Sequence, residues 1–332
     1  MTVIRFASLL AVFVPISSWA IDAQLSAIDY IGKMGQALQT LNYHGSLVYI
    51  NDGRVESMQL IHKNDGEGEF ERLVHLSGEP REVIRKNDVV TCYLPDSQSV
   101  LVGQRRFNNH LFAKLTTNLE QFAPNYGFLT VGKSRVAGKN AHIIEINPKD
   151  PYRYGYRLWI EETSNLLLKS ELVNAQGEVL EQMMFTQIEI VDHIPEAMLK
   201  PAISGDSFTW HGDDEKSKNS LDIDRSWQVA NLPSGFVISA RYKQQMPNST
   251  QPAEHVVISD GLASVSVYIE PFNAESQSFV GASRMGAVNI FGSVHDDHQV
   301  TVVGEVPMPT VEMIAQSLHY SPDSSAEQKA GQ

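Results

Sequence analysis

Short apolar stretches separated by turn-forming residues dominate the chain, and the pattern is clearest between Leu41 and Leu94. Asn51-Asp52-Gly53, Asn64-Asp65-Gly66 and Asn87-Asp88 each interrupt it. Asn, Asp and Gly tolerate positive φ angles, so these positions predict hairpin turns. Strands joined so tightly must be antiparallel, because a parallel pair needs a long crossover. The pattern therefore predicts an antiparallel meander with strands at Ser46–Ile50, Val55–His62, Phe70–Leu76, Glu82–Arg85, Val89–Leu94 and Ser99–Val102.

The same pattern resumes after a less regular segment, Gly103–Gly127, in which Leu111–Leu115 and Leu119–Phe122 are expected to form short helical turns. Several of the later strands carry apolar side chains on both faces. One face can pack on the core of the sheet, but the other needs a helix, a second domain or a ligand to cover it. We therefore expect a hydrophobic concavity along the strands Phe128–Lys133, Asn140–Ile146, Tyr154–Ile160, Leu166–Val173 and Val179–Ile190.

Apolar residues at three- and four-residue spacing predict two amphipathic helices, one at each end of the strand-rich region. The first is expected to start at Asp22, which would cap it, and to end at Thr40. Its apolar stripe needs a partner, and the meander supplies one. The second is expected between Thr310, again as the cap, and His319.

The composition changes between residues 195 and 221, where Pro, Gly and charged residues predict a linker. Beyond it, strands are expected at Val237–Lys243, His255–Ser259, Ala263–Glu270, Ser283–Gly292 and His298–Glu305. The predicted fold is α+β, with a first domain over residues 21–194 and a smaller antiparallel sheet with one covering helix over residues 222–320. Residues 321–332 are expected to form a disordered tail.

The first 20 residues have the three parts of a secretory signal peptide. Arg5 supplies the positive charge, Phe6–Ile16 the apolar run, and Ser18 and Ala20 the small residues of a cleavage site. This predicts export to an oxidising compartment. The single cysteine, Cys92, cannot form an internal disulfide and is expected to act as a small buried apolar residue. The formal net charge of −13 argues against a nucleic-acid partner.

No motif of known catalytic mechanism appears in the chain. A glycine-rich phosphate loop, a Gly-x-Ser-x-Gly elbow and a His-Glu-x-x-His helix are all missing from the sequence. His295-Asp296-Asp297-His298 could offer ligands to a metal, but such residues are also expected in a hairpin turn, and neighbours on one turn rarely converge on one ion. We favour the turn, and we expect neither a cofactor nor enzymatic activity.

Several short motifs resemble the periplasmic sigma-E regulatory proteins of the RseB/MucB family. They cover nearly the whole chain after the signal peptide, and their order and spacing carry the resemblance more than any one of them. They are Leu41–Tyr43, Val55–Ser57, Leu76–Val83, Phe122–Phe128, Val131-Gly132, Arg153–Ile160, Gly177–Gln182, Leu232–Phe236, Ser259–Leu262 and Val302–Pro307.

The resemblance implies a fold and a function. The fold would be an N-terminal domain like LolA and LppX, an unclosed antiparallel β-barrel with helices in its mouth, followed by a smaller C-terminal α/β domain. The function would be to bind the periplasmic region of a membrane anti-sigma factor (RseA/MucA-like) and protect it from regulated proteolysis, with release by lipid or lipopolysaccharide. The alternative is a periplasmic lipid or lipoprotein carrier of the LolA type. Self-association into a homo-oligomer is left open by the sequence.

If the first domain holds a lipid, apolar residues on its two-sided strands are the candidates to line the cavity. The alternative for each of them is an ordinary place in the core. The candidates are Met58, Leu60, Phe122, Phe128, Trp159, Met183 and Phe185.

Overall fold

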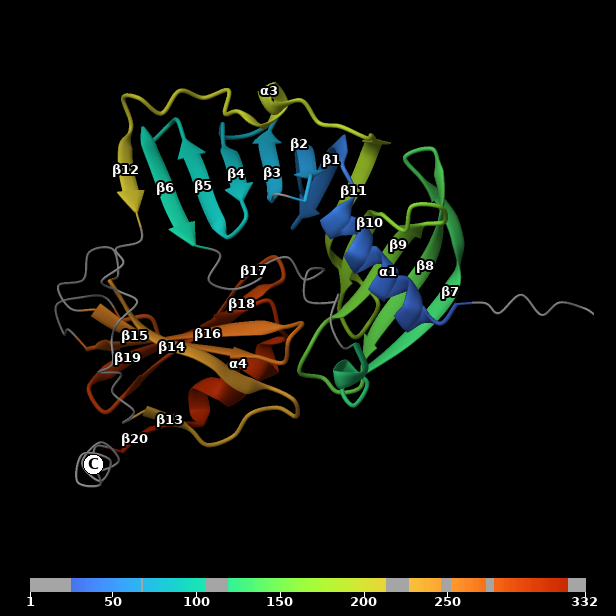
Figure 1. Ribbon diagram of the computed structural model, residues 1–332. Coiled ribbons are helices and arrows are strands. Elements are labelled where there is room, and N and C mark those ends of the chain that lie inside the picture. Colours follow the sequence, from blue (N-terminus) through green and yellow to red (C-terminus); the bar gives the residue numbers. More distant parts are fainter. Residues whose placement is uncertain are drawn as a thin grey trace, which may run out of the picture.

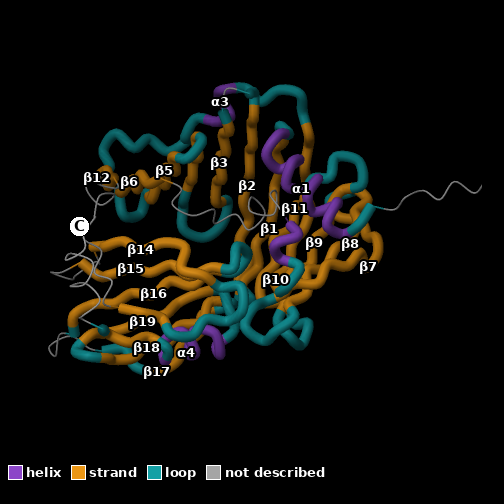
Figure 2. The backbone as a smooth tube through the Cα atoms, turned by 60° about the horizontal axis from the view of Figure 1, so that its bottom comes forward, coloured by secondary structure: helices purple, strands orange, loops and turns teal. Residues whose placement is uncertain are grey.

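The computed structural model describes residues 25–66, 68–104, 119–212, 227–245, 252–272 and 278–321. These residues form a large first sheet and a smaller second sheet, each with its own core (Figures 1 and 2). The expected signal peptide, the helical turn expected at Leu111–Leu115 and all but the first residue of the expected tail lie outside the described residues. No helix among the described residues is long and apolar enough to cross a membrane.

The first sheet has twelve strands in the order β12-β6-β5-β4-β3-β2-β1-β11-β10-β9-β8-β7. Its two ends do not pair, so the sheet curves without closing into a barrel, as expected. The strands are β1 (Tyr43–Asn51), β2 (Arg54–Asn64), β3 (Glu69–His75), β4 (Glu82–Lys86), β5 (Val89–Leu94), β6 (Ser99–Gln104), β7 (Tyr126–Val136), β8 (Lys139–Pro148), β9 (Gly155–Glu161), β10 (Leu167–Val173), β11 (Val179–Ile190) and β12 (Thr209–Gly212).

The predicted hairpin turns are confirmed in the first sheet. β1 and β2 are joined by two residues, Asp52 at φ 49° and Gly53 at φ 74°, and the pairing starts at once between Asn51 and Arg54. Both turn residues therefore have the left-handed backbone that a tight antiparallel hairpin requires. The expected helical turn before β7 is present as a 3₁₀ helix, η1 (Leu119–Phe122).

Helix α1 (Ala27–Thr40) lies on the inner side of the curved sheet. It contacts β2 as well as β7 and β8, which are far apart in the strand order, so it must bridge the concave face. The expected start at Asp22 is wrong, because the helix begins at Ala27 and Leu25 is not helical. Ser26 is the cap: its Oγ accepts from the Asp29 backbone N–H, and the Asp29 carboxylate accepts from the Ser26 backbone N–H in return.

The segment after β11, which the sequence assigns to a linker, packs on the first sheet over part of its length. It contains the short helix α3 (Glu196–Leu199) and strand β12, which pairs in parallel with β6 at the sheet edge. Buried Glu82 of β4 anchors it by accepting hydrogen bonds from the backbone N–H groups of Ala202 (3.0 Å) and Ile203 (3.3 Å) and by pairing with Arg72.

The second domain is an antiparallel sheet in the order β14-β15-β16-β19-β18-β17 with helix α4 (Met308–Gln316) on one face. Its strands are β14 (Val237–Gln245), β15 (Pro252–Ser259), β16 (Ser264–Pro271), β17 (Gly281–Met285), β18 (Val288–His295) and β19 (His298–Gly304), and a separate pair is formed by β13 (Trp227–Val229) and β20 (Leu318–Tyr320).

Two expectations for this domain are wrong in detail. The single strand expected over Ser283–Gly292 is a hairpin, because Gly286 at φ 60° turns the chain between β17 and β18. Thr310 does not cap the last helix. The helix begins earlier, after Pro307, and Thr310 is buried inside it with its hydroxyl bonded to the first domain.

In the first domain, Cys92 is less buried than expected, since it is partly exposed on β5.

Candidate binding site at the domain junction

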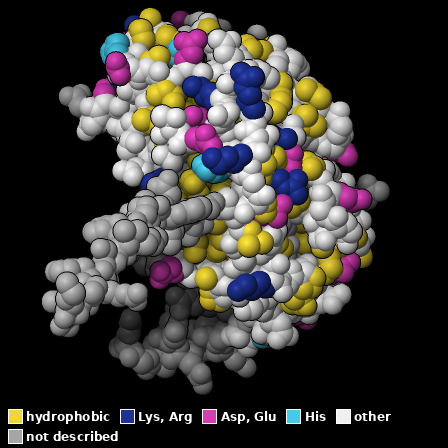
Figure 3. Space-filling view, turned by 90° about the vertical axis from the view of Figure 1, so that its right-hand side faces the viewer, with side chains coloured by type: hydrophobic (Ala, Val, Ile, Leu, Met, Phe, Trp, Pro, Cys, Tyr) yellow, Lys and Arg dark blue, Asp and Glu magenta, His cyan; other side chains and the backbone are white. Residues whose placement is uncertain are grey.

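The exposed face beyond β7 offers no concentrated patch of one kind. Figure 3 shows hydrophobic, basic and acidic side chains interspersed over this side of the molecule. Leu129 and Val131 of the edge strand β7 are exposed, but charges of both signs surround the apolar surface. The concentrated polar and apolar contacts lie instead where the two domains meet.

Arg153, in the turn before β9, is the centre of this junction. Its side chain is fully buried, and its Nη1 donates to the equally buried carboxylate of Asp260 in the second domain at 2.6 Å. Nη2 donates to the carbonyl oxygen of Ser234, also in the second domain, and lies 3.1 Å from the Asp150 carboxylate. The guanidinium also lies over the ring of Phe236, 4.8 Å from its centre. One cation thus joins three segments.

Asp260 uses its remaining hydrogen-bonding capacity within the same site. It accepts from the Tyr126 hydroxyl at 2.8 Å and from the backbone N–H groups of Leu262 (2.8 Å) and Ala263 (2.7 Å). The backbone bonds form the turn between β15 and β16, and the side-chain bonds carry that turn to the first domain. A buried carboxylate with this many donors is well compensated for its loss of water.

Close backbone approach completes this side of the junction. A Cβ atom at Gly261, where φ is 99°, would lie only 2.6 Å from the ring of Phe122 in η1. A Cβ atom at Gly235 would meet the Asn125 amide at 2.1 Å. Both turns of the second domain can therefore approach the first domain this closely only because they carry glycine.

Two further hydrogen bonds join the two domains, and a third, within the second domain, holds the donor of the first. Buried Asn289 of β18 donates to the Tyr154 hydroxyl (2.9 Å) and to the carbonyl oxygen of Val306 (2.7 Å). The Thr310 hydroxyl of α4 donates to the carbonyl oxygen of Tyr152 at 2.7 Å. We call the contacts around Arg153, Asp260, Tyr126 and Asn289 the closed side of the junction, because polar groups and packed rings fill it.

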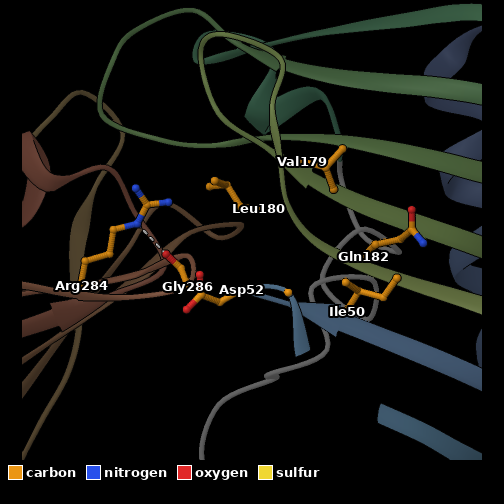
Figure 4. Close-up of a pocket in the computed structure, with 8 residues that line it drawn as sticks. Ile50, Asp52, Val179, Leu180, Gln182, Arg284 and Gly286 are labelled. Carbon is orange, nitrogen blue, oxygen red and sulfur yellow. Dashed lines mark hydrogen bonds between the residues drawn. The ribbon is translucent and has the colours of Figure 1, made fainter. Parts of the chain in front are cut away.

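The opposite side of the junction is open. A pocket of about 410 Å³ lies between the β1–β2 turn and the start of β11 in the first domain and the β17–β18 hairpin in the second (Figure 4). Its lining residues are Ile50, Asp52, Gly53, Val179, Leu180, Gln182, Arg284 and Gly286. We call this the junction pocket. It combines apolar walls with one cationic side chain, Arg284.

Two carboxylates from different domains influence each other near this pocket. Glu181 of β11 accepts from the Tyr49 hydroxyl (2.7 Å) and from the Asn51 side-chain amide (3.2 Å). Glu305, just after β19, keeps contact with solvent, but the surrounding protein atoms and the negative charge of Glu181 raise its pKa to about 6. The junction therefore contains a carboxyl group that titrates near neutral pH.

The predicted cavity residues do not form one lining. The paired residues Leu47, Met58 and Phe185 share the helix-facing side of the first sheet, as do Leu60 and Met183. Trp159 lies on the opposite side. It pairs with Lys169, which in turn pairs with Met184, whereas Leu158 pairs with Ser170, which in turn pairs with Met183. The Lys169 ammonium lies 4.3 Å from the centre of the Trp159 ring.

The other two candidates, Phe122 and Phe128, belong to a cluster that includes α1 residues and the second-domain residues Leu262 and Ala287. Phe122 is buried against Gly261, so it packs at the junction and not inside the first domain alone. Among the described residues, neither of the two best-formed pockets is lined by any of the seven candidates. A lipid-binding role for them stays a prediction.

The His295–His298 segment is a hairpin turn, as favoured. Asp296 and Asp297 have φ angles of 45° and 57°, and His295 pairs with His298 across the turn. His298 stacks on Tyr320, with ring centres 5.8 Å apart. No group of three or more His, Cys, Asp or Glu side chains in the described part of the chain is placed to hold a metal ion.

The sequence motifs that carry the family resemblance contain the residues of the closed side, but they do not predict which of these residues contact one another. Arg153, Tyr126, Asp260 and Ser234 all lie in the segments that carry the family resemblance, but these segments are separated by more than 100 residues in places. Arg284 was missed entirely, because it was placed inside a continuous strand. The signal that could have found it is Gly286, which breaks that apolar stretch.

The fold and the junction define a class: a two-domain β-sheet protein with a buried polar lock on one side of the domain boundary and an open pocket on the other. Residues 26–203 match the MucB/RseB N-terminal domain, and residues 222–319 match the MucB/RseB C-terminal domain. The chain belongs to the MucB/RseB family.

Individual relatives are similar over nearly their whole length. The chain is 28% identical to the sigma-E factor regulatory protein RseB of Haemophilus influenzae over 313 residues, which cover 92% of this chain and 95% of the relative. It superimposes on Pseudomonas aeruginosa MucB in its complex with MucA with a TM-score of 0.70 and 28% identity, covering 89% of this chain and 99% of the other. For another crystal structure of MucB the TM-score is 0.61, with 27% identity and coverage of 89% and 98%.

Proposed function

We propose that this protein is a periplasmic negative regulator of a sigma-E-type envelope stress response. It binds the periplasmic region of a membrane anti-sigma factor and withholds that region from regulated proteolysis. The family membership and the similarity to RseB over nearly the full length support this function. The two domains are both needed in this proposal, because the junction that holds them together is part of the binding unit.

The observation that carries the proposal is the better superposition on partner-bound MucB. At the same coverage of this chain, the TM-score is 0.70 against the MucA/MucB complex and 0.61 against another crystal structure of MucB. The chain therefore superimposes better on the MucB that holds its partner. A closed side built on a buried ion pair favours one such arrangement of the domains before any partner binds, which lowers the cost of ordering on binding.

Protection would follow mass action. The protected fraction of the anti-sigma segment equals the fraction bound, so it rises with the concentration of this protein relative to the dissociation constant. A lipid or lipopolysaccharide that binds the free protein more tightly than the complex would lower this fraction and allow proteolysis. We retain this release step in the proposal, with the first domain as the ligand-binding part.

The test is a pull-down with the periplasmic segment of the anti-sigma factor from the same organism, followed by a protease-protection assay. We expect the segment to be retained and its cleavage to slow in proportion to occupancy. The proposal is refuted if the segment is not retained, or if it is cleaved equally fast with and without saturating protein. Adding lipopolysaccharide to the preformed complex tests release separately, since only that step requires cleavage to recover.

A further inference from the structure

We propose that the junction pocket receives an acidic side chain of the anti-sigma segment together with an adjoining apolar residue, and that Arg284 binds the carboxylate. This inference rests on the proposed function, because it names the part of the partner that the pocket recognises. It is carried by three observations: an arginine that has no acidic partner among the residues that the structure describes, apolar walls beside it, and a hairpin backbone that lies at the domain boundary.

Arg284 lacks a carboxylate partner among the described residues, in contrast to three other arginines of the chain. Arg153, Arg157 and Arg241 each form an ion pair with a carboxylate. Arg284, on the exposed strand β17, donates its Nε to the carbonyl oxygen of Gly286 at 2.7 Å and forms no ion pair with any described residue. The two terminal nitrogens carry four more N–H donors, in a planar fork that matches a carboxylate.

One hydrogen bond within its own hairpin orients this guanidinium. Figure 4 shows the dashed bond from Arg284 to Gly286, with the terminal nitrogens turned away from that bond toward the Leu180 side of the pocket. Gly286 is itself held against the first domain: a Cβ atom there would lie 2.0 Å from the Asn51 side-chain oxygen. The arginine is therefore presented across the boundary between the domains, not at a freely moving surface.

Apolar side chains of the first domain form the other wall. Ile50 is the last but one residue of β1, and Val179 and Leu180 start β11. Val179 is 47% exposed and Leu180 is half-buried, and such side chains beside a guanidinium suit a ligand that pairs a carboxylate with an apolar group. The volume of about 410 Å³ is at the small end of the range for ligand pockets, and it suits a few side chains.

The polar part of the lining favours a peptide over a lipid chain. The Gln182 amide, the Asp52 carboxylate and the backbone of Gly53 and Gly286 all border the pocket. A peptide backbone can hydrogen-bond to such groups, whereas an acyl chain would leave them without water and without partners. Asp52 and the nearby Glu181 also repel a second negative charge, so the site accepts one carboxylate, placed at the Arg284 end.

The experiment compares Arg284→Glu with Arg54→Glu in the full-length protein. Arg54 is an exposed residue of the neighbouring β1–β2 hairpin and does not line the pocket, so its reversal changes the local field by the same charge. The probe is a set of fluorescent peptides that tile the periplasmic region of the anti-sigma factor, measured by anisotropy. We expect Arg284→Glu to weaken the best-binding peptide by about 10- to 100-fold and Arg54→Glu to weaken it less than about 3-fold.

A charge swap completes the test. Within the best-binding peptide, we expect one Glu or Asp beside an apolar residue whose change to Gln or Asn lowers the affinity for the unaltered protein by the same factor. Changing that residue to Lys should restore binding to the Arg284→Glu protein. Equal effects of Arg284→Glu and Arg54→Glu, or no acidic position that couples to Arg284, would overturn the inference. If Arg284→Glu weakens binding of a fluorescent fatty acid but leaves peptide binding unchanged, the inference is overturned and the pocket binds a lipid instead. If no peptide binds the unaltered protein, the proposed function itself fails.

Discussion

The two sides of the domain junction join the same pair of sheets in opposite ways. On the closed side, a fully buried Arg153–Asp260 ion pair, the Tyr126 hydroxyl and the Phe122 ring leave no space between the domains. On the open side, the β1–β2 turn and the β17–β18 hairpin border a pocket lined by Arg284, whose Nε donates to a backbone carbonyl. Arg153 thus has carboxylate partners, whereas Arg284 has none among the described residues.

The difference suggests that the closed side holds the two domains together, whereas the open side is available to bind a ligand. A buried ion pair adds little net stability compared with a well-packed apolar core, but it tolerates only one geometry, because any other leaves a charge without a partner. It therefore specifies how the domains are placed. An arginine at a solvent-exposed pocket is hydrated when the pocket is empty, so leaving it without a carboxylate costs little free energy. Its guanidinium therefore remains available to a ligand. The comparison predicts that substitutions on the closed side change stability and domain placement, whereas those on the open side change binding.

The largest expected effect is on the closed side. Asp260→Asn keeps the shape of the side chain but leaves the buried Arg153 with only the Asp150 carboxylate, 3.1 Å from its Nη2. We expect the free energy of unfolding to fall by about 3 kcal/mol, at the low end for breaking a buried ion pair. Urea unfolding followed by circular dichroism measures this, and small-angle scattering reports whether the domains separate.

The matched control on the open side is Asp52→Asn, which makes the same chemical change at an exposed pocket residue. Asn also tolerates the positive φ of this turn position. We expect a change within about 0.5 kcal/mol. Similar losses for both variants would show that the closed side does not hold the domains more firmly than the open side.

The strand pattern could be predicted from the sequence because each hairpin is encoded locally. The bounds expected for β5 and β11 agree with the structure, since Asn, Asp, Gly and Pro flank both strands. Errors arose where a residue has two common roles. Gly286 resembles a glycine within a strand but turns the chain, and Thr310 resembles a helix cap but bonds to Tyr152 in the other domain.

The binding site was harder to predict, because it depends on contacts between distant segments. Arg153 and Asp260 are 107 residues apart, and no spacing rule relates them. Apolar residues on two-sided strands predicted that both faces are covered, but not by what. Phe122 is covered by the second domain at Gly261, and Met183 and Phe185 face the helix side of the sheet. Only the three-dimensional arrangement separates a core position from a pocket wall.

A smaller effect is expected from filling the closed side with one methyl group. Gly261→Ala places a Cβ atom 2.6 Å from the buried Phe122 ring, and φ is 99° at this position. Gly53→Ala, in the turn that borders the open side, has φ 74° and nothing within 4 Å of the added atom. Both variants suffer the backbone strain of about 1 kcal/mol, but only the first adds a steric clash, which we place at about 1 kcal/mol, the low end for one added methyl group.

Urea unfolding of the two alanine variants therefore separates the strain from the clash. We expect Gly261→Ala to unfold at a clearly lower urea concentration than Gly53→Ala. If Phe122 can move aside without cost, the two midpoints will coincide, and the closed side would then be less tightly packed than the contacts indicate.

The smallest expected effect concerns Glu305, which is influenced by Glu181 across the domain boundary. Its pKa in the folded protein is about 6, above the ordinary value of 4.5, so the folded state favours the protonated form. Between pH 4.5 and about pH 6 the unfolded chain binds fewer protons at this residue than the folded protein does. The free energy of unfolding must therefore fall as the pH rises through this range. The loss is complete above about pH 6. Because the side chain keeps contact with solvent, we expect it to be less than about 1 kcal/mol.

Glu305→Gln should remove this pH dependence by mimicking the protonated form at every pH. We expect the variant to match the unaltered protein near pH 4 and to be more stable at pH 8, with Glu79→Gln, in an exposed turn, as the control. Thermal unfolding from pH 4 to pH 8 measures the difference. If the two curves stay parallel over that range, neither burial nor the charge of Glu181 shifts the pKa of Glu305 in the folded protein.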